Sequence, residues 1–212
     1  IGGNHLIHAA RRNIDLTCLL FNNAVYGMTG GQVAPTTPSG ALASTAPYGN
    51  LEPPFDACRL LAAAGATFVA RALAYRPLEL TDLIARALEH PGFAFIEVLS
   101  DCPEFFGRYN ALGRGPEMLV GMPRYDAAID TVLAGKRVVP HLPLPAAPAG
   151  LPLGLLHEET RPEFSESCWR AIREACAQAG DGRAASPQAA GLQRWRVGDT
   201  SNGARGRRPV GE

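Results

Sequence analysis

Three short apolar runs alternate with three helical patterns over the first hundred residues, and this order restricts the fold more than any other feature of the chain. The apolar runs have the length of strands and occupy residues 14–21, 67–71 and 93–99. The helical patterns occupy residues 3–13, 54–64 and 77–89. Helices and strands in this order predict an α/β fold, a parallel sheet flanked by helices.

Polar loops follow the first and the last of these predicted strands. Asn22 and Asn23 come directly after the first strand, and residues 100–102 come directly after the last. Ligands of parallel sheets bind beyond the carboxyl ends of the strands, so we expect the two loops to converge on one edge. Residues 27–54 are rich in Gly, Pro and Thr, and a loop of that length is usually functional or disordered.

The composition predicts three parts of the chain. Residues 1–139 form the α/β domain, and residues 140–179 form an irregular extension of a proline-rich connector and a C-terminal helix over residues 163–179. A further helix is expected over residues 126–133. Residues 180–212 have the composition of a disordered tail.

Charge and cysteine content exclude several classes of protein. The 20 basic and 20 acidic residues balance, so bulk electrostatics would hold neither nucleic acid nor an anionic membrane. The five cysteines are scattered without a C-x-x-C pattern, which favours reduced thiols and a cytoplasmic location. The sequence has no apolar run of about 18 residues that would predict a membrane span.

The segment NNAVYGMTGGQ, residues 22–32, carries groups suited to a metal and a phosphate. An asparagine after a buried strand offers an amide oxygen, and a backbone carbonyl two residues later can turn toward the same point. Mg2+ prefers such oxygen ligands, and the glycines at 27, 30 and 31 would let a ligand approach the backbone closely. Taken alone, a glycine-rich segment after a strand is more often an ordinary turn than a ligand site.

The first 13 residues, IGGNHLIHAARRN, together with the NNAVYGMTGGQ segment resemble the beta subunits of 2-oxoacid:ferredoxin oxidoreductases. The 2-oxoglutarate:ferredoxin branch is the nearest, and the similarity extends to about residue 179. The resemblance implies a thiamine-diphosphate-binding fold of the pyrimidine/diphosphate type. It also implies a subunit truncated at its N-terminus, because the family's Gly-Asp-Gly would stand just upstream of Ile1.

The resemblance assigns roles to individual residues. Asn23 would give Mg2+ a side-chain ligand and Val25 a backbone carbonyl, while Gly27, Met28 and Thr29 would line the diphosphate and thiazolium of thiamine diphosphate. No catalytic residue is assigned.

Cys102 lies in a second segment that resembles the family, SDCPEFFGR, residues 100–108. There the cysteine is the last of four ligands to a 4Fe-4S cluster, and a thiolate followed by proline suits such a site. The alternative is a buried free cysteine at the end of a strand.

The activity that the resemblance implies is oxidative decarboxylation of a 2-oxoacid to its acyl-CoA, with electron transfer to ferredoxin. The expected partners are an alpha subunit, small gamma and delta subunits, ferredoxin, the 2-oxoacid and coenzyme A. Residues 49–71 favour 2-oxoglutarate, whereas Gly30, which replaces a lysine of some relatives, leaves a branched-chain or pyruvate-type substrate open. A catalytically inert assembly module is the alternative from another class.

Overall fold

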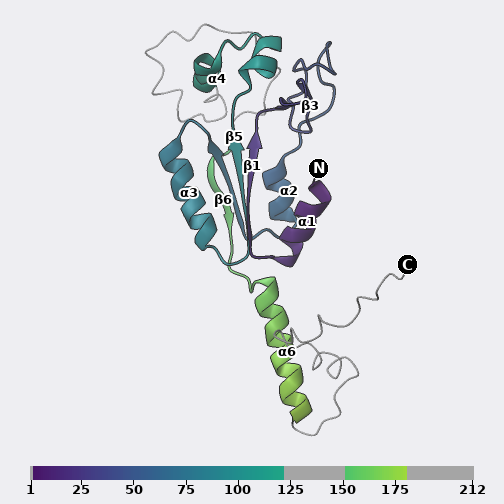
Figure 1. The fold of residues 1–212 in the computed structure, drawn as a ribbon, viewed down its shortest axis with the longest axis vertical. Coiled ribbons are helices and arrows are strands. Elements are labelled where there is room, and N and C mark those ends of the chain that lie inside the picture. The colour runs from purple at the N-terminus through teal and green to yellow at the C-terminus, as the bar shows by residue number, and fades with distance from the viewer. Residues whose placement is uncertain (1, 122–150, 181–212) are drawn as a thin grey trace, which may run out of the picture. The chain divides into compact units, whose positions relative to one another are not determined.

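A four-stranded sheet forms the centre of the computed structural model, which describes residues 2–121 and 151–180 (Figure 1). Its strand order is β1-β5-β4-β6. β1 (Leu16–Asn22), β5 (Phe93–Leu99) and β4 (Phe68–Leu73) run parallel, and β6 (Gly154–Glu158) pairs antiparallel with β4. The predicted α/β fold with a parallel sheet is thereby confirmed.

Helices cover both faces of the sheet. α1 (Gly3–Arg12) and α2 (Ala57–Ala63) lie on one face, and α3 (Pro77–Glu89) lies on the other (Figure 1). The alternation of side chains along β4 and β5 explains this arrangement, since successive residues point to opposite faces. One set packs with α1 and α2 around Leu61 and Phe95, and the other packs with α3 around Leu83 and Ile96.

The two inner strands are buried along their whole length. Every residue of β4 and of β5 is buried, as expected for strands with helices on both faces. Arg71 and Glu97 are the charged residues of these strands, and they face each other as partners in the β4–β5 register. The two inner strands, otherwise apolar, thus contain one pair of opposite charges.

Asn13 forms hydrogen bonds that link several segments at the amino ends of the parallel strands. Its backbone is left-handed, with φ 53°, and ends α1. Its amide oxygen accepts hydrogen bonds from the Thr67 hydroxyl at 2.7 Å and from the Phe93 backbone N–H at 2.9 Å. Its amide nitrogen donates to the carbonyl of Arg161 at 3.1 Å. One buried side chain therefore joins the end of α1, the residue before β4, the start of β5 and the segment after β6.

Several short elements were not predicted from the sequence. β2 (Val25–Tyr26) and β3 (Gln32–Val33) form a small antiparallel hairpin at the start of the long loop. β6 lies within the segment predicted to be a proline-rich connector and helix. η1 (Pro103–Gly107) and α4 (Gly115–Gly121) follow β5. These elements are too short to show a period of their own. The three strands form because β2 pairs with β3 and β6 pairs with β4.

A second compact unit, Ser165–Glu212, contains nearly all of α6 (Phe164–Gly180). This helix confirms the one predicted over residues 163–179. The helix predicted over residues 126–133, the predicted domain boundary at residue 139 and the tail after residue 180 lie outside the described residues.

The helices of the described ranges are too short or too polar to cross a membrane.

Candidate functional site at the carboxyl edge of the sheet

The two loops predicted to converge do so. β1 and β5 are neighbours, with Asn22 paired to Leu99, and the backbone N–H of Ser100 donates to the carbonyl of Asn22 at 2.9 Å. The chain leaves both strands at the same edge, into the β2–β3 hairpin on one side and η1 on the other. This pairing brings residues about 80 positions apart in the sequence into one site.

Gly27 lies between the two predicted ligand residues of this edge. A Cβ atom built on Gly27 would be 3.1 Å from Sγ of Cys102 and 3.5 Å from Nδ2 of Asn23. Any larger residue at position 27 would fill the space between these two side chains. The structure therefore brings Asn23, Gly27 and Cys102 together, as the sequence predicted.

Two consecutive asparagines shape the turn that leaves β1. The amide oxygen of Asn22 accepts a hydrogen bond from the backbone N–H of Ala24 at 3.0 Å, and that of Asn23 accepts one from Val25 at 3.4 Å. Ala24 has φ 65°, a left-handed conformation that is unfavourable for a residue with a side chain. Its carbonyl accepts a hydrogen bond from the hydroxyl of the fully buried Thr37. These contacts hold the Asn23–Val25 turn in its bent form.

Gly31 is required by the close approach of η1. It has φ 79°, and a Cβ atom there would lie 2.7 Å from Cβ of Phe105. Its backbone N–H donates to the carbonyl of Tyr26 at 2.9 Å, closing the turn between β2 and β3. The hairpin therefore packs directly on the segment that follows Cys102.

The remaining predicted site residues differ in exposure. Met28 and Thr29 are exposed, and the Thr29 hydroxyl donates to the side-chain oxygen of Gln32 at 2.7 Å. The Gln32 amide in turn donates to the Thr29 carbonyl at 2.6 Å. The Val25 side chain is buried against Ala41 and Phe106. Only the backbone of Val25 is therefore suited to contact a ligand.

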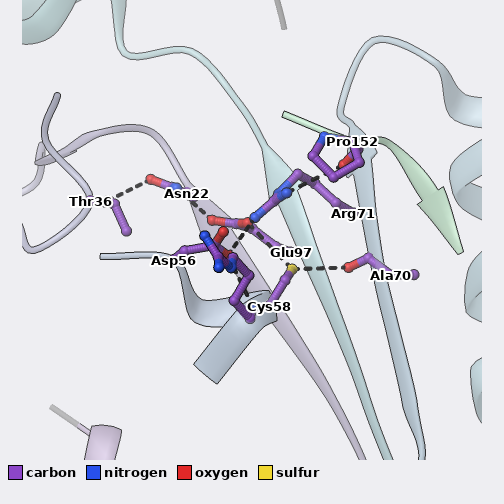
Figure 2. A network of polar contacts seen from close by, with 9 residues as sticks. Asn22, Thr36, Asp56, Cys58, Ala70, Arg71, Glu97 and Pro152 are labelled. Atoms are coloured by element: carbon purple, nitrogen blue, oxygen red, sulfur yellow. Dashed lines mark hydrogen bonds and ion pairs between the residues drawn. The ribbon is translucent and has the colours of Figure 1, made fainter. Parts of the chain in front are cut away.

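Beneath this edge lies a buried polar network that was missed from the sequence (Figure 2). Glu97 accepts a hydrogen bond from Nε of Arg71 at 2.7 Å and one from Nδ2 of Asn22 at 2.8 Å. Arg71 also contacts Asp56 at 2.8 Å, and Asp56 caps the N-terminus of α2 through the backbone N–H of Arg59. Opposite charges in two apolar strands were the signal available in the sequence.

Cys58 adjoins the network but is not a reactive thiol. Its Sγ lies 3.6 Å from Oε2 of Glu97 and is buried. Burial, followed by the charge of Glu97, raises the pKa of Cys58 far above its ordinary value. Burial alone would lower the pKa of Arg71, but the neighbouring groups outweigh it and raise that pKa. Because Cys58 stays protonated, the negative charges facing Arg71 are those of Glu97 and Asp56.

The donor atoms at the edge fit Mg2+ in kind. The amide oxygen of Asn23 and a backbone carbonyl are hard ligands, and the 3.4 Å hydrogen bond to the Asn23 oxygen leaves it acceptor capacity. Within residues 2–121 and 151–180, His, Cys, Asp and Glu side chains nowhere gather in threes as a metal site would require. The described residues of this edge therefore supply oxygen donors of the kind that Mg2+ takes, without a cluster of acidic side chains.

Comparisons with known proteins show what the chain is similar to. Residues 1–98 match the family model described as "Thiamine pyrophosphate enzyme, C-terminal TPP binding domain". The chain is 56% identical over 119 residues to 2-oxoglutarate synthase subunit KorB of Methanothermobacter marburgensis. The aligned residues make up 56% of this chain and 42% of that protein. It is 50% identical over 113 residues to 2-oxoglutarate oxidoreductase subunit KorB of Mycobacterium tuberculosis. Here the aligned residues make up 53% of this chain and 30% of that protein.

A solved structure is similar over more of the chain. The 2-oxoglutarate:ferredoxin oxidoreductase from Magnetococcus marinus, with 2-oxoglutarate, coenzyme A and succinyl-CoA bound, superposes with a TM-score of 0.63 at 28% identity. The match covers 82% of this chain and 57% of that one. The chain thus spans less than half the length of the two curated relatives. The resemblance inferred from the sequence is confirmed.

Proposed function

Because the chain is related to the beta subunits of 2-oxoacid:ferredoxin oxidoreductases, we propose that it carries one part of the thiamine diphosphate site of such an enzyme. The observation that supports this most directly is the meeting of Asn23, Gly27 and Cys102 at the carboxyl edge of the sheet. The reaction is the oxidative decarboxylation of a 2-oxoacid to its acyl-CoA, with the electrons passing to ferredoxin.

The residues of the turn after β1 hold the cofactor in this proposal. The side-chain oxygen of Asn23 and the backbone carbonyl of Val25 bind Mg2+, and Gly27, Met28 and Thr29 line the diphosphate and the thiazolium. Thiamine diphosphate, when bound, supplies the carbanion that attacks a ketone carbon and accepts the electrons released with CO2. The exposed Met28 and Thr29 are open to a ligand from outside the chain.

Cys102 gives one thiolate ligand to a 4Fe-4S cluster in this proposal. The other three ligands come from outside the described residues. The closeness of Cys102 to the turn supports the assignment, since a Cβ atom built on Gly27 would lie 3.1 Å from its Sγ. A cluster beside the cofactor keeps the electron path short. The partners are the alpha subunit, gamma and delta subunits, ferredoxin and coenzyme A, in a cytoplasmic complex.

The substrate proposed is 2-oxoglutarate. The names of the two KorB relatives and the ligand in the Magnetococcus marinus structure support this choice over a branched-chain 2-oxoacid or pyruvate.

Titration of thiamine diphosphate into the protein with and without Mg2+ tests the cofactor site. We expect binding that requires Mg2+, that is lost in Asn23→Ala, and that is retained in Asn23→Asp, which keeps an oxygen ligand. The titration is repeated with the alpha subunit present, and the complex is then supplied with 2-oxoglutarate, pyruvate and a branched-chain 2-oxoacid. Absence of binding in both preparations would refute the proposal and favour an assembly module.

A further inference from the structure

Asn22 connects the buried ion pair to the turn that follows β1. Its amide nitrogen donates to Oε1 of Glu97 at 2.8 Å, inside the sheet. Its amide oxygen accepts a hydrogen bond from the Thr36 hydroxyl at 2.7 Å, on the loop side (Figure 2). The same oxygen accepts one from the backbone N–H of Ala24 at 3.0 Å. The same side chain therefore contacts both the core and two points of the loop.

Glu97 determines which way the Asn22 amide faces. An ionised carboxylate only accepts hydrogen bonds, so it selects the nitrogen of the amide and directs the oxygen toward the loop. Arg71 donates to the other carboxylate oxygen, Oε2, at 2.7 Å. Arg71 is itself fixed by Asp56 at 2.8 Å and by the carbonyl of Pro152 at 3.3 Å.

The orientation of Asn22 has consequences for the Asn23–Val25 turn. Ala24 sits in a left-handed conformation that needs external support, and the bond from its N–H to Asn22 is one such support. Asn23 and Val25 flank Ala24, so the conformation of Ala24 sets where the Asn23 side chain and the Val25 carbonyl point. The Thr36 contact ties the distal part of the loop to the same amide.

The charges of the buried ion pair are balanced without the hydrogen bonds of Asn22. Arg71 contacts Glu97 and Asp56 directly, and Asn22 adds nothing to the charge of the group. Asn22 has its second function on the loop side, where its oxygen receives two donors. The arrangement matches that of outer residues in metal sites, which orient the ligands that touch the metal.

We propose that Glu97, held by Arg71, is a positioning residue that acts through Asn22 to fix Asn23 and the Val25 carbonyl for Mg2+-thiamine diphosphate. This inference rests on the proposed function of the turn and adds to it the residues that orient its ligands. Glu97 and Asn22 do not themselves touch the cofactor in this arrangement.

A swap of the two hydrogen-bonding groups tests the proposal. Glu97→Gln or Asn22→Asp alone breaks the link, because each places two donors or two acceptors face to face. In the double variant Asn22→Asp/Glu97→Gln, the glutamine amide donates to the new carboxylate while its oxygen accepts from Arg71. Asn22→Ala removes the link, and Cys58→Ala is the matched control that touches Glu97 on the side away from the loop.

Two measurements are made on the full protein, in its complex where the complex is needed for binding. Hydrogen exchange of residues 24–37 reports the order of the loop without cofactor. Titration reports the affinity for thiamine diphosphate with Mg2+. We expect Asn22→Ala and the single swaps to exchange faster and to bind about 10- to 100-fold more weakly. The double variant recovers most of both losses, and Cys58→Ala changes neither.

Unchanged binding and exchange in Asn22→Ala would overturn the proposal. So would a double variant no better than Glu97→Gln, or a Cys58→Ala variant as weak as Asn22→Ala. A wild-type protein that binds no cofactor in any preparation would overturn the proposed function, and the positioning role with it. Binding by the wild type that Asn22→Ala leaves intact overturns the positioning role alone.

Discussion

Arg71 and Glu97 face each other across β4 and β5, with Nε of Arg71 2.7 Å from Oε2 of Glu97 and both side chains almost fully buried. Removing one partner of such a pair leaves the other charge buried and unpaired. We therefore expect Arg71→Met to lower the free energy of unfolding by about 3–5 kcal/mol, measured by urea denaturation.

The exposed pair Arg86–Glu158 is the control for this prediction. Its contact is 3.2 Å, yet both side chains are more than 40% exposed. We expect Arg86→Met to lower the free energy of unfolding by about 0–1 kcal/mol, because solvent screens the pair. An Arg71→Met variant as stable as Arg86→Met would show that water reaches the Arg71 site.

Much of the fold could be predicted because its signals are local. α3 and β5 were predicted at both of their ends, since Pro77 begins the helix and Gly92 separates it from the strand. β6 and the β2–β3 hairpin were not predicted, because strands of two to five residues are defined by the segments that pair with them. The general rule for parallel sheets correctly placed Asn23 near Cys102.

The network beneath the site was missed for a physical reason. Charged residues in a strand usually indicate a solvated position, and the sequence does not say that Arg71 and Glu97 occupy the same level of neighbouring strands. Strand register is a property of the folded sheet. The sequence shows Asn22 only as a residue at the end of a strand, because its contact with Glu97 depends on the register between β1 and β5.

Gly31 provides a prediction about the packing of the hairpin on η1. Gly31→Ala would place a methyl group 2.7 Å from Cβ of Phe105 and would strain a backbone with φ 79°. Gly30→Ala is the matched control, because it has φ 115° but only an ordinary contact, 3.6 Å from the Gln32 amide. We expect Gly31→Ala to cost about 1–3 kcal/mol more than Gly30→Ala in urea unfolding. Equal costs would show that backbone strain alone decides both.

His90 predicts a dependence of stability on pH. Burial lowers the pKa of His90, and the charges of Glu158 and Asp15 oppose this only in part. The neutral ring lies 2.8 Å from the Thr67 hydroxyl, which itself donates to Asn13. Below the ordinary histidine pKa of about 6.5, the unfolded chain binds a proton more readily than the folded one. The stabilisation of the folded state by neutral His90 is thus present above this pH. It is lost as the pH falls toward the lowered pKa that His90 has in the folded protein.

Urea unfolding at pH 7.5 and at pH 5.5 measures this effect. His90→Gln keeps an N–H donor for Thr67 but does not titrate. We expect the wild type to lose more stability than His90→Gln between the two pH values. Equal losses would show that protonation of His90 is not linked to folding.

The five cysteines are expected to react at very different rates with iodoacetamide. The thiolate is the reactive form, and burial with the nearby Glu97 charge raises the pKa of Cys58 so that almost no thiolate exists at neutral pH. Burial also raises the pKa of Cys18. Cys168 and Cys176 are exposed.

We expect Cys168 and Cys176 to be modified first and Cys58 last, as mass spectrometry of peptides would show. In urea, which unfolds the protein, all five cysteines should react at similar rates. Early modification of Cys58 in the folded protein would mean that α2 opens from the sheet, and its rate in Asn22→Ala would show whether the loop contacts restrain that opening.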